Sequence, residues 1–458
     1  MRVVPPLNIP ADAAVAHPDF LMGVATASFQ IEGATFEDGR LPSIWDTYCT
    51  EPGRILNNDD GTVACDHYHR WEADVELIAS LGVKAYRLSL AWPRVMDEKG
   101  NPNAKGLAFY KNLLDRLVSK GIETYVTLYH WDLPQYLQDR GGWANRDTAY
   151  RFAEYADLVS RELAGKVTAW ATLNEPWCSA YLGYGEGRHA PGVTDLRQTT
   201  QALHHLLLGH GLALAKLKAN DPGAKLGIVC NTGTFKPLTD SAADKDAAHL
   251  AYVQQNYWVF DPLLLGSYPA DIFRLWPGTE PLVLPGDMEI ISTPMDFFGI
   301  NYYFNSVVES NGQGGYKEAP HSDNVERTQM GWEVYPQGLT EILVDFHQRY
   351  KMPPVYITEN GMASDDRVAE DGVADPQRIR FLESHLMAVN AAMQAGVDVR
   401  GYFIWSLMDN FEWSYGYERR FGITHVDYTT QVRTPKHSAL AVTEYLRQRQ
   451  ERGERAQR

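Results

Sequence analysis

Residues 104–131 read AKGLAFYKNLLDRLVSKGIETYVTLYHW, and this stretch shows the repeating unit of the chain. Its first half places apolar side chains at the spacing of one helix face, those of Leu107, Tyr110, Leu114, Leu117 and Val118. Gly121 ends this pattern, as glycine often does after a helix. The run that begins at Glu123 is rich in β-branched and aromatic residues. The stretch therefore predicts an amphipathic helix followed by a buried strand.

Seven further strand-like runs recur along the chain. They are FLMGVATAS from Phe20, AYRLSLAW from Ala85, VTAWATLNEP from Val167, AKLGIVCN from Ala224, DFFGINYY from Asp296, PVYITENG from Pro354 and VRGYFIWSLMDN from Val399. Near-continuous apolar strands that alternate with amphipathic helices predict a parallel sheet covered by helices. With the first run these make eight units, which predict an α/β protein with a single (β/α)8 TIM barrel and extended βα loops. A doubly wound open sheet is the alternative.

A single domain accounts for the length of the chain. Barrels with extended loops reach sizes like its 458 residues, and no Pro/Gly/Ser-rich linker or charge run divides the sequence. The hydrophobic fraction of 44% is enough for one large core. We expect the barrel to occupy residues 17–448, with flexible segments at residues 1–16 and 449–458.

Composition narrows the partners and the compartment. The formal charge of -16, with no basic cluster, disfavours nucleic acids and anionic membranes as partners and favours a small neutral ligand. The four cysteines lack CxxC spacing, so we expect reduced thiols and no metal site. The sequence has no apolar run long enough for a membrane span and no signal peptide pattern. We expect a cytoplasmic protein without a cofactor, and a homo-oligomer stays open.

Two glutamates end predicted strands on the same rim of the barrel. Glu175 precedes Pro176, which favours extended backbone before it and cannot continue a strand ladder. Glu359 precedes the turn signal Asn360-Gly361. Inward-pointing glutamates on the fourth and seventh strands can approach to about 5–5.5 Å, the separation used by retaining glycosidases. A solvated loop position suits most single glutamates, but this paired placement favours a catalytic pair.

Seven motifs in a fixed order carry a family resemblance. They are FLMGVATASFQIEGA, YRLSLAWPR, TLYHWDLP, TLNEPW, FFGINYY, ITENG and WSLMDNFEW. The chain resembles glycoside hydrolase family 1, the β-glucosidase family, in its bacterial form, over nearly its whole length. The resemblance implies a catalytic barrel that hydrolyses β-linked glycosides with net retention. It implies Glu175 as acid/base and Glu359 as nucleophile, with Arg87 and Tyr303 beside Glu359 to favour its charged form.

The resemblance also implies a sugar-binding rim. The residues expected to bind the substrate are Gln30, His130, Trp131, Asn174, Asn301, Trp405, Glu412, Trp413 and Phe421. Amide, imidazole and carboxyl groups suit sugar hydroxyls, and an indole face suits the apolar face of a pyranose ring. Taken alone, each of these residues could equally have a structural role in packing or capping. Only their joint placement on one rim favours a sugar-binding site. Possible aglycone contacts are Trp177, Tyr184 and Trp332, near a long polar segment at residues 306–330.

Several functions compete with a β-glucosidase acting on cello-oligosaccharides and on aryl or alkyl β-glucosides. A 6-phospho-β-glucosidase usually has Ser in place of Glu412, and an S-linked glycoside hydrolase usually replaces the acid/base by Gln. A non-catalytic sugar-binding barrel usually loses one of the two glutamates, and this chain keeps both. A metalloenzyme lacks support, since no HxH or HExxH cluster ends a strand, and His204, His205 and His210 have no evident carboxylate partner. Preference among glucose, galactose and fucose stays open.

Overall fold

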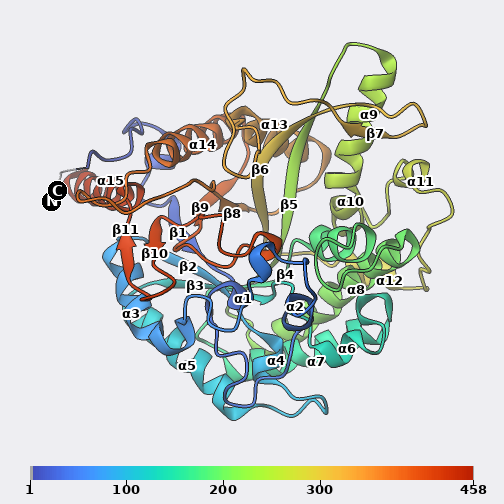
Figure 1. The fold of residues 1–458 in the computed structure, drawn as a ribbon, viewed down its shortest axis with the longest axis horizontal. Coiled ribbons are helices and arrows are strands. Elements are labelled where there is room, and N and C mark those ends of the chain that lie inside the picture. Colours follow the sequence, from blue (N-terminus) through green and yellow to red (C-terminus); the bar gives the residue numbers. More distant parts are fainter. Residues whose placement is uncertain (1–3, 457–458) are drawn as a thin grey trace.

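The computed structural model describes residues 4–456, and its centre is a closed barrel of parallel strands (Figure 1). Within this range the barrel has eight strands, β1 Leu21–Ala25, β2 Ala85–Ser89, β3 Glu123–Tyr129, β4 Ala169–Asn174, β5 Lys225–Pro237, β6 Phe297–Ser310, β8 Val355–Asn360 and β9 Val399–Trp405. Neighbours along the chain pair in parallel, β9 pairs with β1, and the β5–β6 pairing completes the ring. The predicted TIM barrel is confirmed, and the open-sheet alternative is wrong.

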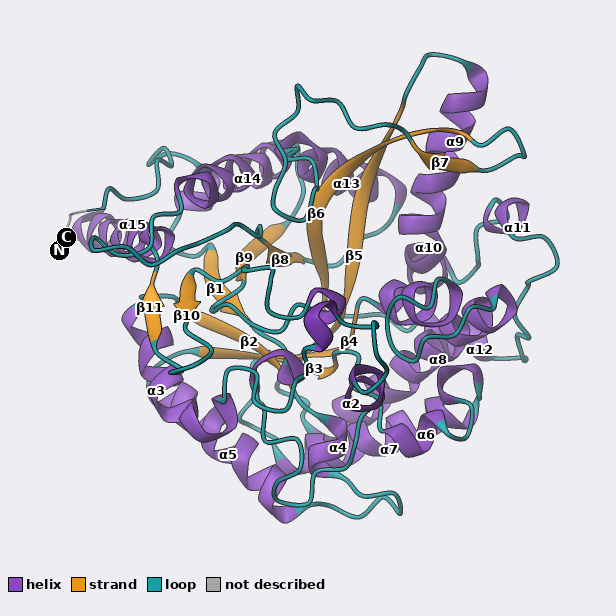
Figure 2. Ribbon diagram, in the orientation of Figure 1, coloured by secondary structure: helices purple, strands orange, loops and turns teal. Residues whose placement is uncertain are grey.

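Helices surround the strands as an outer layer (Figure 2). The longer ones are α3 His67–Ser80, α5 Ala104–Ser119, α7 Asp147–Glu162, α8 Leu196–Asn220, α9 Ala242–Tyr252, α10 Trp258–Leu265, α13 Pro336–Arg349, α14 Pro376–Gln394 and α15 His437–Ala456. Shorter helices in the loops are α1 Ser28–Ile31, α2 Ile44–Cys49, α4 Trp92–Val95, α6 Gln135–Gln138, α11 Ile272–Leu275 and α12 Asp287–Ile291. Short 3-10 or π segments lie at Ala14–Ala16, Leu56–Asn58, Gly142–Ala144, Cys178–Gly185, Val253–Tyr257 and Trp413–Tyr415. Further strands are β7 Tyr316–Glu318 and the hairpin β10 Thr424–Val426 with β11 Arg433–Pro435.

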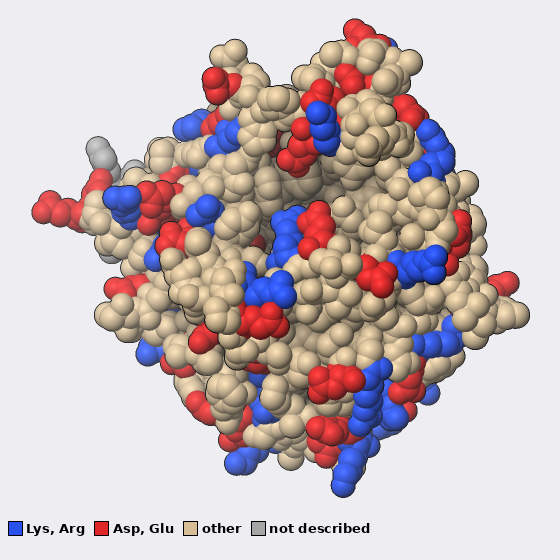
Figure 3. Space-filling view, turned by 45° about the vertical axis from the view of Figure 1, so that its right-hand side comes forward, with Lys and Arg blue, Asp and Glu red and all other residues tan. Residues whose placement is uncertain are grey.

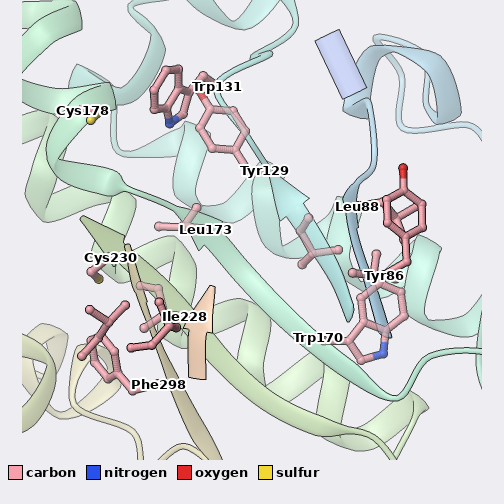
Figure 4. Packing of buried hydrophobic residues seen from close by; sticks show 14 of the residues in the cluster. Tyr86, Leu88, Tyr129, Trp131, Trp170, Leu173, Cys178, Ile228, Cys230 and Phe298 are labelled. Carbon is pink, nitrogen blue, oxygen red and sulfur yellow. The ribbon is translucent and has the colours of Figure 1, made fainter. Parts of the chain in front are cut away.

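Strand alternation divides the core into two layers. On β2, Tyr86 and Leu88 belong to the buried cluster between strands and helices, which Figure 4 shows from close by. Ala85 of the same strand belongs to the separate cluster inside the barrel, with Phe403 and Trp405 of β9. The period of two along a strand explains this split. Inside the barrel, a larger residue in place of Gly23 would clash, because its Cβ would lie 2.6 Å from the Phe403 ring.

The ladder of β5 and β6 extends beyond the barrel rim. Pairing continues to Pro237 and Val308, well past the polar residues that end the other strands. β7 then pairs antiparallel with the far end of β6. Figure 1 shows this arm rising above the ring of strands, and it becomes one wall of the cavity described below.

The terminal segments have more structure than the sequence suggests. Leu7 and Val15 are buried against the barrel's helices, and the Ala14 N–H donates to Asn390 of α14 at 2.7 Å. At the other end α15 continues to Ala456, and Arg449 donates to the Phe20 carbonyl at 2.9 Å. These contacts join Leu7, Val15 and Arg449 to the barrel, and the flexibility of the segments within 4–16 and 449–456 stays a prediction. The expectation for residues 1–3 and 457–458 lies outside the described residues.

Helix length and polarity also bear on membrane insertion. Between residues 4 and 456, no helix combines the length and the apolar character needed to span a bilayer.

Candidate active site

A cavity of about 770 Å³ opens at the carboxyl ends of the barrel strands. Figure 3 shows a hollow on this face, with acidic and basic side chains at its border. Its lining includes Glu175 after β4, Glu359 at the end of β8 and Glu412 in the loop after β9. Catalytic groups of TIM barrels lie at this face. The structure thus brings the two predicted catalytic glutamates into one cavity.

Glu359 is held in a buried, charge-stabilising setting. Arg87 of β2 donates from Nη1 to Glu359 Oε1 at 2.8 Å, and the Tyr303 hydroxyl donates to Oε2 at 2.6 Å. Burial raises the pKa of Glu359 above its usual value, while Arg87 and then Tyr303 oppose that rise. Arg87 is itself buried, so its charge needs this carboxylate partner. These contacts favour an ionised carboxylate at Glu359.

Glu175 occupies a different environment. Its backbone lies in the left-handed region at φ 49°, which turns its side chain at the end of β4 and stores strain at the site. Asn301 donates to Glu175 Oε1 at 2.7 Å, and the Cys178 thiol donates to Oε2 at 3.3 Å. Burial first, and then the charge of Glu359, raise the pKa of Glu175 to about 8. No arginine or lysine bonds to Glu175 in the described part of the chain. Glu175 is therefore the better proton carrier of the pair.

A network of amides connects the two carboxyl groups. Arg87 donates from Nη2 to Asn174 Oδ1 at 2.7 Å, and Asn174 Nδ2 lies 3.1 Å from His130 Nε2. Asn301 also donates to Asn174 Oδ1 at 3.2 Å, and its own Oδ1 accepts from Thr358 at 2.7 Å. The Asn174 oxygen thus accepts from Arg87 and Asn301, and the Asn301 nitrogen donates to Asn174 and Glu175, which fixes the orientation of both amides.

His130 is neutral in this setting. Burial, together with the charge of Arg87, holds the pKa of His130 well below its usual range. Since Nε2 accepts from the Asn174 amide, the proton of the neutral ring is on Nδ1, which can donate to a sugar hydroxyl.

Several buried polar atoms at the site have no hydrogen-bond partner within residues 4–456, and three of them belong to residues predicted to bind the sugar. These three atoms are Gln30 Oε1, His130 Nδ1 and Glu412 Oε2. Gln30 is held in place because its Nε2 donates to the Phe411 carbonyl at 2.8 Å. Burial, with the charges of Glu359 and Glu175, raises the pKa of Glu412 to about 8. Buried polar groups need partners, so these atoms fit a ligand rich in hydroxyl groups.

Aromatic rings surround the polar groups. The rings of His130 and Trp405 stack with centroids 5.9 Å apart, and Trp131 lies 4.5 Å from Trp413. Trp131 lines the cavity, and its indole N–H donates to the Asn174 carbonyl at 2.9 Å. Trp131 and Trp413 both have positive φ, at 81° and 50°. Trp131 follows β3 closely, whereas Trp413 begins the 3-10 segment in the loop after β9, so the strained backbone belongs to the loops that line the cavity.

The predicted aglycone residues divide into two groups. Trp332 and Trp177 line the cavity, and Trp177 donates to the Gln254 carbonyl at 3.0 Å. Phe421 is buried beside Trp332, with ring centroids 6.3 Å apart. Tyr184 lies elsewhere, because its hydroxyl accepts from the Trp143 N–H at 2.9 Å on the far side of the Cys178–Gly185 segment. The structure therefore does not bring Tyr184 to the site.

Some functional neighbours have no signal in the sequence. Cys178 contacts Glu175 and Thr358 fixes Asn301, yet a lone cysteine or threonine beside a motif predicts nothing. One negative expectation is wrong, because His204 does have a carboxylate partner. Its Nε2 lies 2.7 Å from Asp287, which Arg146 also binds, outside the cavity lining. Asp287 lies on α12, far from His204 in sequence, so local spacing could not reveal the pair.

Comparison with known proteins agrees with this geometry. The sequence profile of glycosyl hydrolase family 1 matches residues 14–451. A beta-glucosidase from Agrobacterium sp. is 45% identical over 426 residues, which cover 92% of this chain and 93% of the relative. A bifunctional beta-D-glucosidase/beta-D-fucosidase from Bifidobacterium breve is 45% identical over 444 residues, with 92% and 95% covered. The crystal structure of a GH1 beta-glucosidase from Exiguobacterium antarcticum superposes with a TM-score of 0.92 at 43% identity, covering 95% of this chain and 98% of that one. The chain belongs to glycosyl hydrolase family 1.

Proposed function

We propose that the protein is a cytoplasmic, retaining β-glucosidase that removes terminal non-reducing β-D-glucosyl residues from β-glucosides. The observation that carries the proposal is the unequal pair of buried carboxyl groups. Glu359 has Arg87 and Tyr303 to stabilise its charge, whereas the pKa of Glu175 is raised to about 8. Such a pair divides the roles of nucleophile and proton donor near neutral pH.

The first step uses both groups in their resting protonation states. The Glu359 carboxylate attacks the anomeric carbon, and the C1–O bond to the aglycone breaks. Glu175 gives its proton to the departing oxygen, so the aglycone leaves as a neutral alcohol. The product of this step is a glucosyl ester on Glu359, with Glu175 now a carboxylate.

The second step reverses the role of Glu175. Esterification removes the charge of Glu359, and that charge is one cause of the raised pKa of Glu175. The pKa of Glu175 therefore falls in the intermediate, and its carboxylate accepts a proton from water as that water attacks C1. Glucose leaves with its original β configuration, and both carboxyl groups return to their starting states.

The glycone subsite follows from the polar atoms that lack protein partners. Gln30, His130 and Glu412 would bind hydroxyl groups on one part of the ring, and Trp405 would cover its apolar face. Asn174 would bind the 2-hydroxyl, a contact that strengthens toward the oxocarbenium-like transition state. Arg87 fixes the orientation of Asn174 for this contact.

A kinetic panel tests the proposed activity. The substrates are the p-nitrophenyl β-glycosides of glucose, galactose, fucose and glucose 6-phosphate, with cellobiose alongside. We expect hydrolysis of the glucoside, and the dual activity named for the Bifidobacterium breve relative makes the fucoside the closest competitor. Absence of β-glucoside hydrolysis would contradict the proposal.

A further inference from the structure

The loop after β9 carries part of the proposed glycone subsite. Residues 406–423 connect β9 to β10, and Glu412 and Phe421 of this loop line the cavity. The two limbs of the loop run side by side, since the Asp409 N–H donates to the Thr424 carbonyl at 3.0 Å. The position of Glu412 therefore depends on what holds the base of this loop.

The Asp409 side chain lies at that base and is fully buried. Its Oδ1 accepts from the Gly422 N–H at 3.0 Å, and its Oδ2 accepts from the Val426 N–H at 3.3 Å. The limbs approach so closely that a Cβ on Gly422 would lie 2.1 Å from the Asp409 nitrogen. One carboxylate thus fixes the returning limb of the loop against the outgoing limb.

Asp409 is also a member of a buried ion network. Lys436 donates from Nζ to Asp409 Oδ1 at 2.7 Å, and it also donates to Asp366, in the loop after β8, at 2.5 Å. Arg420 donates from Nη1 to Asp409 Oδ2 at 2.7 Å. The ion network consists of Asp366, Asp375, Asp409, Arg378, Arg420 and Lys436. Its three carboxylates match its three cations in formal charge, so the loss of one charge leaves another without compensation.

Gln30 holds the two residues that separate Asp409 from Glu412. Its Nε2 donates to Asn410 Oδ1 at 3.0 Å, and its carbonyl accepts from the Phe411 N–H at 3.2 Å. A short run of fixed residues therefore connects the ion network to Glu412. A displacement of Asp409 displaces Glu412 relative to the sugar.

We propose that Asp409 is a positioning residue for sugar recognition, which holds the Glu412 carboxyl group against the 4- and 6-hydroxyl groups of glucose. This role rests on the proposed β-glucosidase function and names what supports its glycone subsite. Asp409 lies outside the cavity lining, so its effect on the substrate passes through Glu412. A displaced carboxyl group loses hydrogen bonds to the hydroxyl groups that it should meet, which lowers kcat/KM for substrates that carry them.

The test compares p-nitrophenyl β-glucoside with p-nitrophenyl 6-deoxy-β-glucoside, which differs only by the missing 6-hydroxyl group. In the natural chain, kcat/KM for the glucoside should exceed that for the 6-deoxy substrate by at least about tenfold. Asp409→Asn keeps the shape of the side chain and removes its charge. It should lower this ratio at least about threefold, because the glucoside has more hydrogen bonds to lose. A smaller fraction of folded enzyme lowers both rates equally, so the ratio separates positioning from stability.

Arg420→Gln is a second variant, for which the fold should be more tolerant. It removes one cation that binds Asp409, from a side chain that is 22% exposed. The ratio should fall in the same direction as in Asp409→Asn, and it decides the outcome if Asp409→Asn does not fold.

Asp261→Asn is the matched control. Asp261 of α10 is likewise a buried aspartate, which accepts from Arg349 at 2.8 Å, but it lies outside the cavity lining. This variant should keep the ratio of the natural chain, even where the free energy of unfolding falls.

Three results would overturn the role of Asp409 while β-glucosidase activity stands. They are an unchanged ratio in Asp409→Asn or in Arg420→Gln, an equal fall in Asp261→Asn, and equal kcat/KM for the two substrates in the natural chain. Loss of activity on every β-glucoside in the natural chain would overturn the proposed function itself.

Discussion

Replacing Tyr303 by Phe removes one hydrogen bond to the proposed nucleophile and leaves the ring in place. The lost contact is the 2.6 Å bond from the hydroxyl to Glu359 Oε2, inside a buried site. Hydrogen bonds to charged groups contribute about 1.5–3 kcal/mol. Since about 1.4 kcal/mol corresponds to one pKa unit, the pKa of Glu359 should rise by about 1–2 units in Tyr303→Phe.

The sign of the effect on activity follows from the protonation state that each group needs. Glu359 must be ionised to attack, so its pKa sets the acidic limb of the kcat/KM profile of the free enzyme. Glu175 must hold a proton, and its pKa of about 8 sets the alkaline limb. Tyr303→Phe should therefore move the acidic limb upward by about 1–2 pH units and narrow the profile, with little change in the alkaline limb.

The assay is kcat/KM for p-nitrophenyl β-glucoside across the pH range in which the fold is stable. Tyr125→Phe is the control, since Tyr125 also donates to a glutamate, Glu123, at 3.3 Å, but at the start of β3 outside the cavity lining. That variant should keep the natural profile. An unmoved acidic limb in Tyr303→Phe, or a shift confined to the alkaline limb, would refute the assignment of Glu359 as the group that must be ionised.

Three further variants or substrates test the remaining roles. Glu359→Ala should lower kcat by at least about 10³-fold, because no other nucleophile is available, and added azide should give an α-glucosyl azide by NMR; recovery of the β-azide alone would count against the role. Glu175→Ala should hydrolyse activated aryl glucosides with a burst and form the β-glucosyl azide with azide, whereas unchanged cellobiose hydrolysis would move the acid/base role elsewhere. A 6-phosphate places negative charge in the buried part of the site beside Glu412, where burial and the charge of Glu359 already disfavour a negative charge and raise the pKa of Glu412 to about 8. We therefore expect kcat/KM for p-nitrophenyl β-glucoside to exceed that for its 6-phosphate by at least about 10²-fold, or about 2.7 kcal/mol. Equal rates on both would favour a phospho-β-glucosidase.

The barrel could be predicted because its strands and helices show patterns that depend on residues close together in the sequence. Apolar runs such as residues 169–174 and helix faces such as that of residues 104–119 repeat at periods that depend only on neighbouring residues. The outer part of β5 could not be predicted in this way. Its sequence NTGTFKP is polar and glycine-containing, and it forms a strand because β6 offers a partner for pairing. Tertiary pairing of this kind overrides local propensity.

The packing of the N-terminal segment could not be predicted for a related reason. Residues 5–16 have only scattered apolar side chains, without helix or strand periodicity. Leu7 and Val15 are nevertheless buried, because each packs against the surface formed by α14 and α15. A docking surface built from distant helices leaves no trace in the short segment that it binds.

The site could be predicted as far as residue identity follows from strand ends and family motifs. Glu175 and Glu359 enter one cavity as expected, and Arg87 and Tyr303 bond to Glu359. Burial is the largest cause of the raised pKa of both carboxyl groups, and how completely the fold buries each of them is not contained in the sequence. The prediction of an aglycone contact for Tyr184 could not succeed from the sequence, because the π-helical segment Cys178–Gly185 turns this side chain toward Trp143 and not into the cavity.

The central claim is double displacement through Glu359, and the configuration of the first product tests it most directly. Proton NMR of p-nitrophenyl β-glucoside hydrolysis, recorded before glucose mutarotates, shows which anomer is released. Two inversions at C1 predict β-glucose as the initial product, followed by slow appearance of the α-anomer. Initial release of α-glucose would show a single displacement by water and would contradict the roles assigned to both Glu359 and Glu175.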